Sequence, residues 1–206
     1  MKTIVWLLGL LALAVFGTSV FIWSGAFNVA ADEPHWALTE YLMRTARDRS
    51  ISSRASGIVP PALDGESLLR AGAGNYDAMC TECHLKPGLV KTEQSSGLHP
   101  EPPDLSRHRI ADPAAAFWVI KHGIKMSGMP AWGRSMEDEY IWGMVAFVQQ
   151  LPDMSQERYA ELVKSSGGHT HGGVGAASGV HDGDTGNTPS GDSIAEDHSK
   201  APPHEH

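Results

Sequence analysis

The only two cysteines of this 206-residue chain lie three positions apart, and a histidine follows the second one directly. In the sequence CTECH these residues are Cys80, Cys83 and His84. Such a pair can form a disulfide, half of a zinc site or a redox-active dithiol, or it can attach a group that also needs the histidine. The spacing and the rest of the sequence discriminate among these chemistries.

The first three chemistries fit the sequence poorly. A structural zinc site needs four ligands, usually from two cysteine pairs or from two cysteines and two histidines, and the chain has no second pair. A thioredoxin-type CxxC opens a helix in a βαβ unit, whereas this pair ends a helical segment. A disulfide alone would not explain His84.

C-x-x-C-H is the attachment sequence of c-type haem. Two thiols at this spacing add to the two vinyl groups of haem, and the tight turn presents the next imidazole to the iron. The sequence therefore predicts one covalently attached haem c, bound through Cys80 and Cys83, with His84 as an axial ligand of the iron.

A second axial ligand is expected from a methionine, because a thioether commonly lies opposite the histidine in low-spin c-type haem. Met129 precedes Pro130 in a loop, and a rigid Met-Pro turn can hold a soft sulfur at bonding distance. We predict Met129 as this ligand and keep Met126 as the alternative. The histidines of the same region that could replace a methionine are His99, His108 and His122.

Helices and loops are expected to position these residues, because no stretch outside the apolar N-terminus shows convincing strand alternation. Apolar spacing and start and stop signals predict helices over 34–52, 64–79, 112–123, 135–152 and 155–164. Asp64, Asp112 and Ser135 are the expected N-caps of three of them. The proline-rich segment 85–111 is long for a compact domain unless it wraps a bound group. The fold class predicted is all-α.

Residues 64–152 resemble a class I c-type cytochrome of the mitochondrial-cytochrome-like type. The resemblance is carried by Gly72 and Tyr76 ahead of CTECH, by the run PPDL at 102–105, by the Met-Pro of GMPAWG and by a last helix ending in QQLP. More narrowly, FNVAADEPHW, FWVIKHGIKMSGMPAWG and the His/Gly-rich tail resemble membrane-anchored monohaem cytochromes of proteobacteria.

This resemblance implies a small helical domain around one haem, in which helices 65–79 and 136–150 cross closely at Gly72. It implies aromatic contact of Tyr76 with Trp142 or Phe147, and it places the methionine ligand at Met129. It also implies that His84 donates its second ring N–H to a proline carbonyl. The candidate prolines are Pro87, Pro102 and Pro103.

The N-terminal residues 1–31 are expected to act as a membrane anchor, with a cleaved signal as the alternative. The twenty residues from Ile4 to Trp23 carry no charge, which suits the apolar core of a bilayer. Lys2 precedes them, and no Lys or Arg follows before Arg44. The positive-inside rule therefore predicts a single-pass protein of a bacterial inner membrane, with the haem domain in the periplasm.

The remaining segments are a helical connector at 32–63, a cytochrome c domain at 64–152, a short helix at 153–166 and a tail at 167–206. The tail is rich in Gly, His and Asp and has few aliphatic residues, so we expect it to be disordered. Its histidines, His169 and His171 above all, could bind a metal ion. The formal net charge is −8. Nucleic-acid binding needs a concentrated basic face, and nothing in the sequence indicates one.

A haem iron with both axial positions filled by the protein suits outer-sphere electron transfer. We therefore expect an electron-transfer protein, not an enzyme, with a respiratory complex, an oxidase or a periplasmic dehydrogenase as its redox partner. Lys121, Lys125 and Arg134 flank the methionine loop and predict a mildly basic docking rim. The alternatives are a protein that handles Cu, Ni or Zn through its tail, and a haem peroxidase or sensor.

Overall fold

The structure, a computed structural model, describes residues 2–169, and these residues form helices and loops without a β-strand. The predicted all-α fold is confirmed. Helix α1 (Lys2–Trp23) is exposed along its whole length. Its 22 residues would measure about 33 Å at ~1.5 Å per residue, so it is long and apolar enough to cross a bilayer. Of the predicted disordered tail, 170–206 lie outside the described residues.

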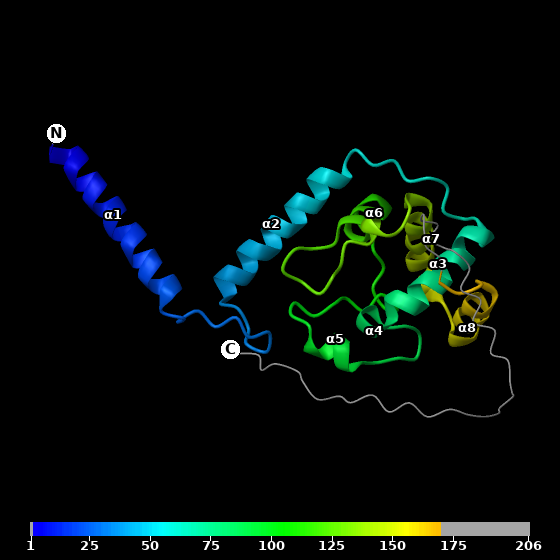
Figure 1. The fold of residues 1–206 in the computed structure, drawn as a ribbon. Helices are drawn as coiled ribbons and strands as arrows, with labels where there is room; N and C mark the ends of the chain where they lie inside the picture. Colours follow the sequence, from blue (N-terminus) through cyan, green and yellow to red (C-terminus); the bar gives the residue numbers. More distant parts are fainter. Residues whose placement is uncertain (1, 170–206) are drawn as a thin grey trace, which may run out of the picture. The chain divides into compact units, whose positions relative to one another are not determined.

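The core of the domain is the crossing of α3 (Glu66–Met79) with α7 (Asp138–Gln150) (Figure 1). At Gly72 a Cβ would lie only 2.0 Å from the carbonyl oxygen of Gly143, so the backbones of α3 and α7 are in contact here. Both positions are glycine, which permits this approach. The rings of Tyr76 and Phe147 lie 5.3 Å apart beside this contact. The crossing implied by the resemblance is therefore confirmed.

Trp142, the other candidate for contact with Tyr76, lies elsewhere in the core. Its ring stacks on Phe117 of α6 (Pro113–His122), with the ring centroids 4.1 Å apart and the planes at 14°. Helix α6 begins as the sequence predicts, because the Asp112 side chain accepts a hydrogen bond from the N–H of Ala114 and proline takes the first helical position.

Two other predicted N-caps are wrong. Helix α3 is preceded by Gly65, not Asp64, and no side chain caps it. Helix α7 begins at Asp138 after Glu137, because Ser135 closes the 3₁₀ turn η1 (Trp132–Arg134) by donating its backbone N–H to the Trp132 carbonyl.

The segment 85–111 is less irregular than its prolines suggest. It contains the short helix α5 (Glu93–Gly97). This helix begins with a reciprocal capping box between Thr92 and Ser95. Helix α4 (Thr81–His84) is a single turn between α3 and this segment. The rest of the segment is loop.

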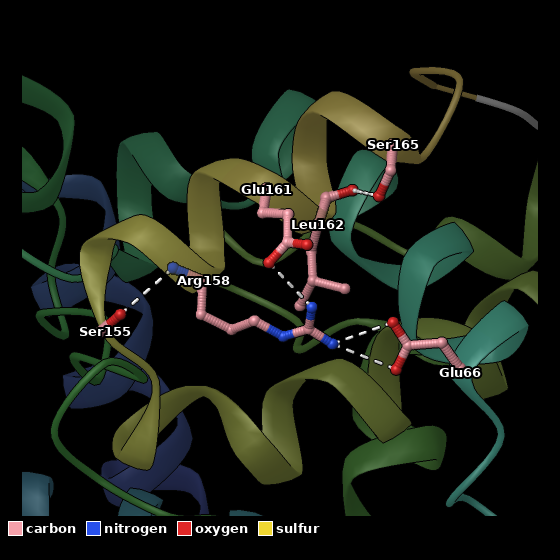
Figure 2. Close-up of polar contacts among 6 residues, drawn as sticks. All are labelled: Glu66, Ser155, Arg158, Glu161, Leu162 and Ser165. Atoms are coloured by element: carbon pink, nitrogen blue, oxygen red, sulfur yellow. Dashed lines mark hydrogen bonds and ion pairs between the residues drawn. The ribbon is translucent and has the colours of Figure 1, made fainter.

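Helix α8 (Gln156–Ser165) follows the 3₁₀ turn η2 (Leu151–Asp153) and packs on α3. Figure 2 shows how Arg158 links the two helices, since its guanidinium donates to both carboxylate oxygens of Glu66 and to Glu161. On the inner side, Leu162 is fully buried and the Tyr159 hydroxyl donates to Asp77 over 2.7 Å. Helix α8 therefore braces the helix that leads to the two cysteines.

Helix α2 (Ala37–Ala55) lies between α1 and α3 in the sequence and packs against α6. Arg47, Ile51 and Ala55 are spaced by four residues and share one side of the helix. Ala55 is only 2% exposed and the other two are half-buried. The side that carries Leu38, Tyr41 and Leu42 is exposed.

Candidate functional site

The two cysteines and the histidine lie on one tight turn. Cys80 ends α3 and precedes the single turn of α4. Its carbonyl accepts hydrogen bonds from the N–H of Cys83 at 3.1 Å and of His84 at 2.7 Å. Leu85 follows with a φ of 63°, which ends the turn and starts the loop. This local geometry brings two thiols and an imidazole to the same side of the chain.

His84 is held by the loop that follows α5. Its Nδ1 lies 2.9 Å from the carbonyl oxygen of Pro103, which can only accept, so Nδ1 carries the proton and Nε2 keeps its lone pair. Of the three prolines that the sequence left open, the acceptor is Pro103. Burial lowers the pKa of His84 more than this hydrogen bond raises it, which favours the neutral ring.

Tyr76 fixes the backbone on the far side of the histidine. Its hydroxyl donates to the carbonyl of Leu85 over 2.7 Å and approaches the carbonyl of His84 at 3.2 Å. The His84 carbonyl also accepts from the N–H of Leu105 at 3.0 Å. Tyr76 is 1% exposed, and burial raises its pKa well above the ordinary value, so its hydroxyl stays a donor.

One cavity of about 340 Å³ collects the residues predicted to bind haem. Cys80, Cys83, His84 and Met129 all line it. Most of its other walls are apolar, with Val119 and Ile120 from α6 and Met144 and Val148 from α7. Its volume falls in the range of small-molecule sites in proteins.

The methionine loop folds on itself and separates the two candidate ligands. The carbonyl of Met129 accepts from the N–H of Ile124 at 3.1 Å, and its N–H donates to the hydroxyl of Ser127 at 3.2 Å. Met126 has a φ of 57°, is 89% exposed and does not line the cavity. The loop therefore places Met129 in the lining of the cavity that His84 also lines and leaves Met126 in solvent.

The histidines considered as replacements lie outside the cavity lining. His99 packs edge-on against His35, with the ring centroids 5.1 Å apart. His108 contacts the Asp104 carbonyl, and His122 packs on Trp118.

The predicted tail metal site falls almost wholly outside the structure. His169 is the last described residue and is exposed, and His171 lies outside the described residues. Within residues 2–169 no group of three His, Cys, Asp or Glu side chains is arranged to hold a metal ion.

The electrostatics of the two thiols argue against a redox dithiol. Burial, with Cys83 nearby, raises the pKa of Cys80 to about 12, and burial also raises the pKa of Cys83. Redox-active cysteines need a lowered pKa to react as thiolates. Neutral thiols, a neutral imidazole with one free nitrogen and a thioether around an apolar cavity fit a covalently attached haem.

The basic rim predicted around the methionine loop is reduced by an ion pair. Lys121 lies 2.6 Å from a carboxylate oxygen of Asp138, at the start of α7, so its charge is largely neutralised. Lys125 and Arg134 are exposed. The rim available to a partner therefore rests on these two residues.

Arg47 and Ile51 of α2 are lining residues that the sequence analysis missed. The arginines of this helix have the pattern of a solvated face, and local sequence gives no sign that one of them faces a cavity. The four-residue spacing of Arg47, Ile51 and Ala55 does place them on one side of the helix. That this side faces the cavity is known only once α2 is seen to pack on α6.

The identity of the helical domain follows from a family comparison. Residues 67–148 match the family model described as cytochrome c oxidase, cbb3-type, subunit III. This segment is therefore a c-type cytochrome domain, and its cofactor is a covalently bound haem c. Comparisons with curated proteins and with solved structures gave no match. The matched segment starts in α3 and ends in α7, so α2 and α8 lie outside it.

Proposed function

We propose that this protein is a membrane-anchored monohaem cytochrome that carries electrons on the periplasmic side of a bacterial inner membrane. In this proposal Cys80 and Cys83 would attach the haem, and His84 and Met129 would ligate its iron. The observation that carries it is the meeting of all four side chains at one cavity, although Met129 comes from a different loop.

Haem c supplies one-electron exchange between ferric and ferrous iron. The protein holds His84 in the tautomer that would ligate iron through Nε2, because the Pro103 carbonyl accepts a hydrogen bond from Nδ1–H. The apolar walls would limit the contact of the haem with water. Because His84 and Met129 would both ligate the iron, no coordination site would remain for a substrate, which favours outer-sphere electron transfer over peroxidase or sensor chemistry.

Helix α1 supports the membrane part of the proposal. It has the length and composition of a single span. Lys2 on its short side favours a cytoplasmic N-terminus, which leaves the haem domain in the periplasm.

The partner we favour is a terminal oxidase or another respiratory complex, because the matched family model is described as an oxidase subunit. Redox partners commonly form small interfaces that depend on charge steering. Lys125 and Arg134, exposed beside the methionine loop, are the residues we propose for such an encounter.

Haem staining of membrane and soluble fractions tests attachment and anchoring together. We expect the wild-type band in the membrane fraction under denaturing conditions, and we expect it to disappear in the double variant Cys80→Ala/Cys83→Ala. Deleting residues 1–31 behind a cleavable export signal should move the stained band to the soluble periplasmic fraction. A wild-type protein without a stained band, or one stained only in the soluble fraction, would contradict the proposal.

A further inference from the structure

The haem cavity is completed by a helix outside the matched cytochrome segment. Helix α2 packs against α6 (Figure 1). It contributes Arg47 and Ile51 to the cavity lining. Ala55, one turn beyond Ile51 on the same side, is 2% exposed and fixes this face of the helix against the domain. The packing of α2 on the domain therefore fixes the position of Arg47, which is not a residue of a free helix surface.

Arg47 is the only lysine or arginine among the residues that line this cavity within the described chain. The only lining carboxylate is Glu101, which is largely exposed and lies 3.9 Å from Lys91. The cavity thus offers one cationic group to a ligand that reaches its edge.

The hydrogen-bonding state of Arg47 leaves this group available. Its Nε donates to Asp48 over 2.8 Å, and its two terminal amino groups make no hydrogen bond to any described residue. Its side chain is 36% exposed, so the guanidinium is at the border between cavity and solvent.

Haem carries two propionate carboxylates, and an ionised carboxylate at an apolar cavity is unfavourable unless it is solvated or paired. A guanidinium can pair with a carboxylate through two parallel N–H groups. We propose that Arg47 pairs with a haem propionate and so tunes the potential of the haem. This inference rests on the haem site proposed above.

The test measures the midpoint potential of the full-length holoprotein in detergent at one pH. Removing the charge in Arg47→Gln should favour the ferric form, raising its ratio to the ferrous form at a fixed applied potential by about tenfold. Arg47→Lys should retain most of the wild-type potential. The matched control is Arg44→Gln, because Arg44 is on the same helix but pairs with Glu40 and does not line the cavity.

An unchanged midpoint potential in Arg47→Gln would overturn the proposal. An equal lowering of the midpoint potential in Arg44→Gln would overturn it as well. If Arg47→Gln does not accumulate as holoprotein, Arg47→Met keeps the aliphatic length beside Ile51 and is measured in its place. Haem staining and the visible spectrum of the wild type are recorded in parallel. Absence of attached haem there would refute the haem site itself, whatever the Arg47 variants do.

Discussion

Nδ1 of His84 lies 2.9 Å from the carbonyl oxygen of Pro103, which comes from the loop beyond α5. This contact joins the attachment turn to the loop that wraps the cavity. It also decides which ring nitrogen is free, since a carbonyl can only accept a hydrogen bond. The loop and the cysteine turn therefore act as one unit in presenting Nε2.

Tyr76 is expected to stabilise that unit without acting on the iron. In Tyr76→Phe the ring still packs on Phe147, but the hydrogen bond to the Leu85 carbonyl is lost. The free energy of unfolding should fall by about 1 kcal/mol, as for a typical buried hydrogen bond. Denaturant titration of the holoprotein measures it. A changed ferric spectrum would show that Tyr76 also affects ligation, contrary to this view.

The crossing of α3 and α7 should be intolerant of one methyl group. In Gly72→Ala the new Cβ would overlap the Gly143 carbonyl, and backbone atoms cannot move aside as a side chain can. We expect a loss of about 3 kcal/mol, larger than the roughly 1 kcal/mol that alanine gains in helix propensity. Thermal unfolding checks this against Gly57→Ala, where a Cβ meets nothing within 4 Å. Equal stability of the two variants would refute the close crossing.

Lys125 and Arg134 should steer redox partners of negative charge. We expect Lys125→Glu/Arg134→Glu to slow oxidation of the ferrous protein by ferricyanide about tenfold at low ionic strength, with the difference shrinking as salt is added. Stopped-flow absorbance measures the rates. Each such replacement changes the net charge by two, so the single variant Lys125→Glu is compared with Lys164→Glu on α8 as its matched control. An equal effect of these two would mean that net charge alone matters.

Several parts of this fold could be predicted because their signals are local. The CTECH turn needs only its own five residues, and Asp112 with Pro113 defines the start of α6. The start of α7 could not be placed, because the 3₁₀ turn before it uses Ser135 and leaves Glu137 as the first flanking residue.

The remaining features depend on contacts between distant segments. Nothing in the spacing selects Pro103 over its neighbours as the partner of His84, since the choice is made by how the loop folds over the turn. Arg47 enters the cavity only because α2 packs on α6. The resemblance supplied the crossing at Gly72, but it offered both Phe147 and Trp142 to Tyr76, and only packing against Phe117 separates them.

The most direct test of the central claim is the ferric absorption spectrum of Met129→Leu beside Met126→Leu. Thioether ligation gives a weak long-wavelength band, which we expect in the wild type and in Met126→Leu and not in Met129→Leu. The reduced Met129→Leu protein should also bind CO, while the wild type should not. A band that persists in Met129→Leu, or CO binding by the wild type, would contradict ligation by Met129.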